Sequence, residues 1–378
     1  MVEASLWSQA YDRARLQDGF IDLTDSNFHH NGLLPGANLL REEFDQWLGS
    51  RCYEPESRGA LAARQAIASF YRSARCPVSA QDVFLTAGTS EAYLTLFTTF
   101  ASVGDVVALP RPGYPLFEHL AERAHLKVVF YDQPFSWGQS SPDRLKLVVV
   151  ISPNNPTGRV YTANDLARVG EFCMDRGAVL VFDEVFDAFL TEGELPRPAE
   201  VSPEVKVVTL NGISKRFGSP DLKLAWMALS GPEAWKTEAC QQLEFSNDLL
   251  LSANSFSQAL LPRLFREMGP WQQEVRDLLA INRQALGVWL DTWPGVLAPH
   301  AQGGIHGLLR FTNLPRGWDD EKWSLYLLEE HTLALHPGYF YDVQESGVLV
   351  YSLLKQPPAF ERGLLQLSSA LSDLGALR

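Results

Sequence analysis

Amphipathic stretches and short apolar runs alternate through the first two thirds of the chain. Helical spacing covers residues 61–75 and 90–101, and strand-like runs occupy residues 83–86, 106–109, 148–152 and 179–182. Residues 147–151 and 178–182 are apolar at every position, which is typical of strands buried on both faces. The pattern predicts an α/β fold in which a mostly parallel sheet is sandwiched by helices, with these two runs as central strands.

The pattern changes after about residue 260. Residues 271–289 have the spacing of an amphipathic helix, and short strand-like runs follow near residues 304–311 and 348–354. These elements predict a second, smaller α+β domain.

Composition favours an enzyme-sized globular protein. With 378 residues, 46% of them hydrophobic, the chain can bury a large core and is expected to form about two domains. The formal net charge of −13 disfavours nucleic acid or an anionic membrane as a partner, because both attract clustered Lys and Arg. The acidic charge by itself identifies no substrate.

Cysteine spacing and the chain's first residues indicate a compartment. The four cysteines form no C-x-x-C pair and have no ligand-like spacing to histidine, so neither a disulfide framework nor a metal site is indicated. The first residues lack the basic start and apolar stretch of an export signal, and no segment approaches the roughly 20 apolar residues of a membrane span. The expected location is the cytoplasm.

Polar side chains that can carry chemistry follow directly after the apolar runs. They are Thr89, Ser90, Asn155, Asp183 and Lys215. In open α/β sheets, ligands bind beyond the carboxyl ends of the strands. The sequence therefore predicts that these five residues converge on one site.

Lys215 and Asp183 are the most telling of the five. A lysine that forms an imine must lose its proton, and burial or nearby cations lower its pKa enough for that. Arg216 and Lys223 are candidates for such positive charge. Asp183 ends a buried strand, where a carboxylate requires a cationic or hydrogen-bonding partner.

The other positions each have a simpler interpretation. Thr89 or Ser90 could cap a helix, although a helix N-terminus also suits a phosphate. Asn155 lies in Asn-Pro-Thr-Gly, which by itself is a turn, and an isolated tyrosine such as Tyr114 is more often a packing residue.

Five runs occur together in a characteristic order: residues 86–92, 112–115 (Pro-Gly-Tyr-Pro), 152–158 (Ser-Pro-Asn-Asn-Pro-Thr-Gly), 182–186 and 209–218. Together they resemble the class I/II aminotransferases of fold type I, an aspartate aminotransferase-like superfamily that uses pyridoxal 5′-phosphate. The resemblance extends from about residue 22 to residue 367. It implies a large domain at residues 46–265 with a mostly parallel seven-stranded sheet, and a smaller α+β domain formed by residues 1–45 and 266–378.

The resemblance also implies roles for individual residues. Lys215 would be the Schiff-base lysine and the base that moves the Cα proton, and Asp183 would pair with the pyridine nitrogen. Asn155 would bond the ring oxygen, with a cis Asn155–Pro156 bond, and Tyr114 would stack on the ring.

Further residues would hold the cofactor phosphate. In this family layout Thr89 and Ser90 would lie near it, Lys223 would stand at a phosphate-binding position, and Tyr53 would reach the phosphate of the neighbouring subunit. Ser214 and Arg216 are candidates for further phosphate contacts. The resemblance therefore implies a homodimer with shared active sites.

Several positions depart from the family pattern. Phe186 replaces a tyrosine that donates to the ring oxygen, and Gly212 and Lys223 replace a phosphate-binding serine and arginine. Val350 stands where an arginine commonly binds the substrate carboxylate. Its substitute could be Lys355, Arg310 or donors around Asn155. With residues 336–341, these departures resemble a bacterial subgroup, most of it of unassigned substrate.

Residues 24–32 would lie over the cofactor. Asn27 and His29 are candidate substrate-binding residues there, together with Asn155, and His29 and His30 could act as acid or base near neutral pH. A surface turn is the alternative for the two histidines.

Three hypotheses follow. The first is a cytoplasmic, homodimeric aminotransferase that acts on an amino acid and a 2-oxo acid. The second is a pyridoxal-phosphate-dependent lyase or cyclase, resembling capreomycidine synthase, that acts on a hydroxylated or guanidino amino acid. The third is a relative that binds an amino acid without catalysis.

Overall fold

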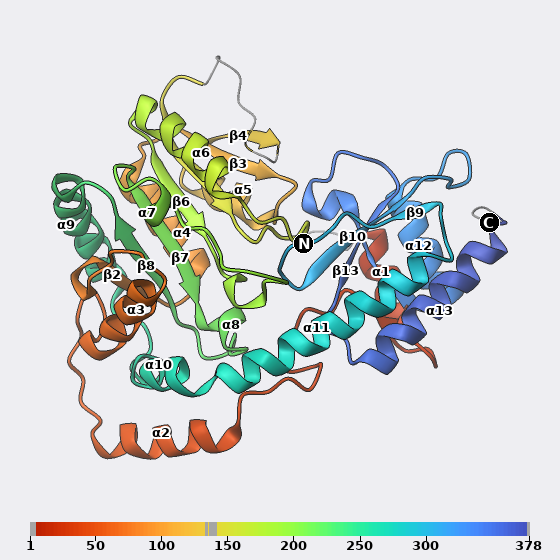
Figure 1. The fold of residues 1–378 in the computed structure, drawn as a ribbon, viewed down its shortest axis with the longest axis horizontal. Helices are drawn as coiled ribbons and strands as arrows, with labels where there is room; N and C mark the ends of the chain where they lie inside the picture. The colour runs from red at the N-terminus through yellow and green to blue at the C-terminus, as the bar shows by residue number, and fades with distance from the viewer. Residues whose placement is uncertain (1–4, 133–134, 136–141, 376–378) are drawn as a thin grey trace.

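The structure is a computed structural model that describes residues 5–132, 135 and 142–375. Its largest sheet has the strand order β2-β8-β7-β6-β5-β3-β4 (Figure 1). The strands are β2 (Val83–Thr86), β3 (Val106–Arg111), β4 (Lys127–Asp132), β5 (Leu145–Ile151), β6 (Val179–Asp183), β7 (Val207–Gly212) and β8 (Ala225–Ser230). β8 pairs antiparallel with β2 and β7, and the other pairs are parallel. The predicted mostly parallel seven-stranded sheet is confirmed, with the two fully apolar runs at its centre.

Helices cover both faces of this sheet, because alternate residues of a strand point to opposite sides. On one face lie α4 (Thr89–Phe100), α5 (Leu116–Arg123) and α9 (Glu233–Leu250), and on the other lie α6 (Ala163–Arg176) and α7 (Pro198–Val201). In β5, Val149 packs with the first group and Val148 with the second. This double cover explains why β5 and β6 are apolar at successive positions.

The C-terminal part of the chain builds a smaller sheet. Its antiparallel strands are β9 (Val296–Leu297), β10 (His306–Phe311), β12 (His336–Pro337) and β13 (Val348–Ser352), in the order β12-β13-β10-β9. The helices around it are α11 (Gly269–Leu290), α12 (Asp320–His331) and α13 (Pro357–Asp373). The amphipathic helix expected at residues 271–289 is therefore present as α11.

The N-terminal segment lies against this C-terminal part. β1 (Ile21–Asp22) pairs in parallel with β11 (Leu333–Ala334), and α1 (Leu6–Ala14) packs on α12. The indole Nε1 of Trp7 donates a hydrogen bond to Ser324 Oγ at 2.7 Å. Residues distant in sequence thus form one packed unit.

The predicted domain boundaries fall within helices. Residue 45 lies in α2 (Ala37–Gly49) and residue 265 in α10 (Ser255–Glu267), which packs on α3 (Leu61–Ser73). The division at these boundaries stays a prediction, and its residues 1–4 and 376–378 lie outside the described residues. Among the described helices, none has both the length and the apolar character to cross a membrane.

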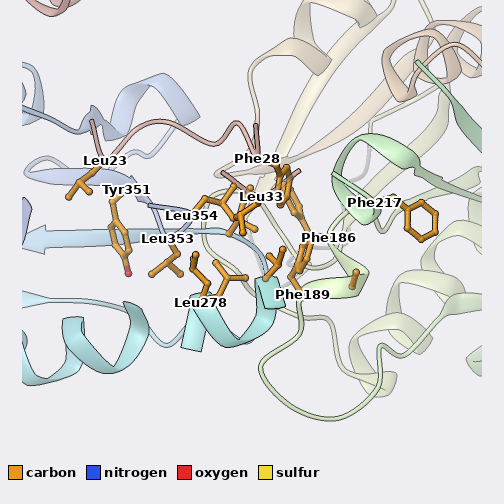
Figure 2. Close-up of a cluster of buried hydrophobic side chains, with 14 of the residues drawn as sticks. Leu23, Phe28, Leu33, Phe186, Phe189, Phe217, Leu278, Tyr351, Leu353 and Leu354 are labelled. Atoms are coloured by element: carbon orange, nitrogen blue, oxygen red, sulfur yellow. The ribbon is translucent and has the colours of Figure 1, made fainter. Parts of the chain in front are cut away.

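One hydrophobic cluster joins the parts of the chain (Figure 2). Phe28 from the N-terminal segment lies 5.8 Å from Phe189 and 5.5 Å from Trp271, measured between ring centroids. Phe186 and Leu354 belong to the same cluster. Because Phe186 also lines the pocket described below, this cluster fixes one wall of the site.

We predict that Phe28→Ala lowers the free energy of unfolding by about 3–5 kcal/mol, because Phe28 is only 1% exposed and its loss leaves a cavity where three parts of the chain meet. Leu16→Ala is the control, since Leu16 is 83% exposed. Urea unfolding followed by circular dichroism measures both variants. Equal stability losses in the two variants would contradict a role for Phe28 in joining these parts.

Candidate active site

A pocket lies where the central strands of the large sheet end. Its cavity has a volume of about 230 Å³ and is lined by Ser26, Thr89, Ser90, Tyr114, Leu116, Phe117, Ile151, Asn155, Asp183, Val185, Phe186, Gly212, Ser214, Lys215, Ala225, His306 and Tyr341. The five residues predicted to converge are all among them. The wall opposite the large sheet comes from the C-terminal part, through β10 and the 3-10 turn η3 (Gly338–Tyr341).

Lys215 lies in the short helix α8 (Ile213–Arg216), directly after β7. A Cβ on Gly212 would lie 3.0 Å from both Leu224 O and Ala225 Cβ, so the absence of a side chain lets β7 and β8 approach closely here. Burial lowers the pKa of Lys215. The effect comes from loss of water contact, whereas Arg216 is ion-paired with Asp187.

Asp183 is the last residue of β6 and is 3% exposed. The hydroxyl of Tyr93 donates to its Oδ2 at 2.8 Å, and the amide of Val185 donates to Oδ1 at 3.1 Å. Burial raises the pKa of Asp183 to about 6, although both hydrogen bonds oppose the rise. The carboxylate therefore has hydrogen-bonding partners, and a cation in the pocket would stabilise its charged form.

Tyr93 is a positioning residue that the sequence reasoning missed. It follows Thr89 by four residues in α4 and so lies on the same face of the helix. Because Thr89 is predicted at the site, this spacing indicates that Tyr93 lies on the helix face toward it, although it does not indicate the bond to Asp183.

Asn154 and Asn155 make different contacts in the Asn-Asn-Pro-Thr-Gly turn. Asn154 Oδ1 accepts hydrogen bonds from the amide and hydroxyl of Thr157, at 3.2 and 2.8 Å, and holds the turn. The Asn155–Pro156 bond is cis, as the resemblance implied. Asn155 Oδ1 is buried and has no hydrogen-bond partner among the described residues. Such an atom costs about 1–3 kcal/mol unless a ligand satisfies the amide.

Thr89 and Ser90 are the first two residues of α4, and the residue that precedes the helix is Gly88. No side chain caps this end, so the capping interpretation of Thr89 and Ser90 is wrong. The free backbone N–H groups, with the positive end of the helix dipole, suit a phosphate.

Tyr114 faces the same pocket from the turn after β3 and is 45% exposed. Its ring meets Phe117 edge-on at 6.0 Å. The amide of Gly113 donates to Tyr341 O at 3.0 Å, which joins this turn to the C-terminal part.

Four predicted site residues lie outside the pocket lining. Lys223 is exposed, and Tyr53 is 79% exposed. Asn27 Oδ1 accepts from the amide of His29, and His29 Nε2 lies 3.0 Å from Gly218 O. Ser26 lines the wall in their place, and the cofactor and substrate roles of these four residues stay predictions.

Two further pocket residues, His306 and Tyr341, were not recognised as site residues. Burial, then the charges of Lys215 and His336, lower the pKa of His306 to about 3, so its imidazole is neutral at neutral pH. Burial raises the pKa of Tyr341 to about 12. Strand pairing in the smaller sheet brings His306 of β10 to the pocket, and the turn η3 that follows β12 brings Tyr341 there.

Behind the pocket, four charged side chains form a buried network: Glu184, Asp187, Arg197 and Arg216. Arg197 donates to Glu184 at 2.6 Å and to Asp187 at 3.2 Å, and Arg216 also donates to Asp187. Asn211 of β7 donates to Asp187 Oδ1 at 3.1 Å. The network ties the segment after β6 to the segment that carries Lys215.

Residues 49–352 match the family described as aminotransferase class I and II. A tyrosine aminotransferase of Caenorhabditis elegans is 26% identical over 84% of this chain and 72% of its own length. A glutamate-pyruvate aminotransferase of Escherichia coli (strain K12) is 29% identical over 75% of this chain and 74% of its own. The structure of an alanine aminotransferase from Pyrococcus furiosus superposes with a TM-score of 0.89 at 20% identity, covering 98% of this chain and all of the other. The chain belongs to the class I and II aminotransferases, a family of enzymes that generally depend on pyridoxal phosphate.

We predict a pH-dependent stability effect from Asp183 in the cofactor-free protein. Because its folded pKa of about 6 exceeds the usual 3.8, the folded state keeps a proton that the unfolded state has lost, and stability falls as pH rises between these values. The loss is about 3 kcal/mol, since one pKa unit corresponds to about 1.4 kcal/mol.

Asp183→Asn removes this loss. The free energy of unfolding of Asp183→Asn relative to wild type should therefore rise by about 2.5 kcal/mol from pH 4 to pH 7 in urea unfolding, since part of the loss already occurs below pH 4. Asp175→Asn, at an exposed position in α6, is the control. A flat difference between wild type and Asp183→Asn across this range would show that Asp183 has no raised pKa.

The buried network generates a second prediction. Asp187→Ala leaves Arg197 and Arg216 without their shared carboxylate and should cost about 3–5 kcal/mol in the free energy of unfolding. Glu192→Ala removes a carboxylate from an exposed position of the same loop and serves as the control. A loss below 1 kcal/mol for Asp187→Ala would mean that the network does not hold these segments.

Proposed function

We propose that the pocket binds pyridoxal 5′-phosphate and that the Lys215 amine bonds to it until the amine of an amino-acid substrate displaces it. The freed Lys215 amine then moves the Cα proton of that substrate. The observation that carries the proposal is that one pocket holds two residues whose pKa values are shifted in opposite directions. Lys215 has a lowered pKa because burial disfavours its cation, and buried Asp183 has a raised pKa that a cationic ring nitrogen would relieve.

The remaining lining residues fit the other parts of the cofactor. Asn155 presents an unsatisfied amide to the ring, and the open N-terminus of α4 at Thr89 and Ser90 accepts the phosphate with Ser214. Tyr114 covers the ring face. When bound, pyridoxal phosphate supplies an electron sink for the carbanion at Cα.

Asp183 would supply the negative charge for this chemistry, and Tyr93 would orient it. The carboxylate keeps the ring nitrogen protonated, and the Tyr93 hydroxyl keeps Asp183 Oδ2 oriented. Phe186, which replaces the tyrosine usual in the family, lines the pocket without a donor. The pKa of the lysine amine is therefore lowered by burial, without help from a donor at position 186.

The active unit in this proposal is a homodimer in the cytoplasm. Four apolar side chains are exposed at the C-terminal end of α9, and Tyr53 is exposed in the segment before α3. The four are Phe245, Leu249, Leu250 and Leu251. The two segments adjoin, because Ser252 Oγ donates to Glu56 O at 3.1 Å. A second copy of the chain would cover these side chains and bring Tyr53 to its neighbour's pocket.

The substrates in this proposal are an amino acid and a 2-oxo acid. A lyase or cyclase that acts on a hydroxylated or guanidino amino acid is the second candidate, favoured by the absence of an arginine from the described pocket lining. A non-catalytic binding relative is the third, and it gives no reason for Lys215, Asp183 and Asn155 to share one pocket.

Absorption spectra of the cofactor-loaded protein test the function. Wild type should convert pyridoxal phosphate to pyridoxamine phosphate with at least one member of an amino-acid panel, and a 2-oxo acid should reverse the change. Lys215→Ala should lose the lysine-linked absorption band and lower turnover by at least about 100-fold. Lys127→Ala, at an exposed position of β4, is the matched control.

The same experiment separates the three candidates. Consumption of a hydroxylated amino acid with release of water or ammonia, and without pyridoxamine phosphate, would identify the lyase or cyclase. A protein that takes up no pyridoxal phosphate would favour the binding relative.

A further inference from the structure

The C-terminal part contributes two polar rings to the pocket wall, His306 and Tyr341, to which the proposed function assigns no role. His306 of β10 is 7% exposed, meets Phe186 edge-on at 6.1 Å and lies 6.4 Å from the Tyr341 ring. The Tyr341 hydroxyl lies 3.2 Å from His336 Nδ1. His306 and Tyr341 line the cavity, and His336 stands behind Tyr341.

Strand register relates these residues to Val350, the position where the family commonly has its carboxylate-binding arginine. β13 lies between β12 and β10, and Val350 is opposite His336 on one side and Leu308 on the other. Residues opposite each other share a sheet face, and so do alternate residues of one strand. His336, Val350 and His306 therefore lie on one face of the sheet. Both strands that flank Val350 carry a histidine on this face.

The arginine substitutes considered from the sequence are engaged elsewhere. Arg310 pairs with Glu345 and lines a separate cavity, and Lys355 Nζ lies 3.8 Å from Asp25 Oδ2. Among the described residues of the pocket lining, Lys215 is the only lysine or arginine. An anionic group that enters the pocket must therefore be held largely by neutral donors.

We propose that Tyr341 and His306 bind the α-carboxylate of the amino-acid substrate in place of an arginine, with His336 as the positioning residue for Tyr341. The proposal rests on the proposed function. If His336 Nδ1–H donates to the Tyr341 oxygen, the phenolic proton is left to donate to a carboxylate oxygen, and a ring N–H of His306 donates to the other.

The charge state of the wall suits this task. Burial lowers the pKa of His336 to about 4, and His306 is also neutral, so both rings keep one N–H and one acceptor nitrogen. The titratable groups that act on them are Lys215 and His336 on His306, and Asp22 on His336, while Tyr114 acts on Tyr341. Neutral donors bind a carboxylate through directed hydrogen bonds. Removal of one donor is therefore measured most directly as a loss of affinity for the amino acid.

The test compares each amino acid that reacts with the matching amine, which lacks only the carboxylate. Tyr341→Phe should raise KM and the spectroscopic Kd for the amino acid about 10- to 100-fold, the range for one hydrogen bond to a charged group, and leave the Kd of the amine within about twofold. His306→Phe should have the same selective effect. Tyr339→Phe, on the same turn with its hydroxyl bonded to Glu321, is the matched control.

His336 is tested through Tyr341. His336→Phe should reproduce part of the affinity loss for the amino acid, and adding it to Tyr341→Phe should cause little further loss, because both changes act on one hydrogen bond. His336→Asn, which keeps a donor, should recover part of the affinity. A merely structural role would weaken the amine and the amino acid equally.

The outcomes also separate this inference from the function. A wild-type enzyme that reacts with amino acids, but whose Tyr341→Phe and His306→Phe variants keep wild-type KM values, overturns the carboxylate site alone. A wild type that binds pyridoxal phosphate but responds to no amino acid overturns the proposed function as well.

Discussion

The burial of Asp183 at the end of β6 is the constraint on which the site depends. This carboxylate is 3% exposed, accepts hydrogen bonds from Tyr93 and Val185 and has a raised pKa, and the pocket in front of it is where a cation would relieve the cost of burying its charge. Lys215 does not relieve that cost, because the influences on the Asp183 pKa are burial and the hydrogen bonds from Tyr93 and Val185, and burial disfavours the charge of Lys215 itself. The two groups together leave room for a ligand that is cationic near Asp183 and accepts an amine at Lys215.

Two separate packing arrangements hold this pocket in shape. On one side, the network around Asp187 ties the segment after β6 to the segment carrying Lys215. On the other side, the C-terminal part is held by the Gly113–Tyr341 backbone hydrogen bond and by an Arg111–Asp342 ion pair. The second arrangement decides where Tyr341 lies. The large sheet thus positions the residues proposed to hold the cofactor, and the smaller sheet positions those proposed to recognise the substrate.

Apart from the exposed Lys223, the departures from the family pattern fall into two groups by location. Gly212 and Phe186 lie in the large-sheet wall, where close packing of β7 on β8 and an apolar cluster account for them. Val350 lies in the smaller sheet, where histidines on both neighbouring strands accompany the change. In the proposed function, the first group would alter how the cofactor is held, and the second would alter what the pocket can recognise.

The sequence by itself determined the sheet of β2 to β8, because fully apolar strands and intervening amphipathic helices are local patterns that require cover on both faces. It also placed Lys215, Asp183, Asn155, Thr89 and Ser90 at one edge, since each lies at or just after the end of a strand. Only the tertiary structure showed Tyr93 bonded to Asp183, or His306 and Tyr341 in the pocket. Those contacts join residues about 90 or more positions apart, and no local pattern encodes the strand register and domain packing that bring them together.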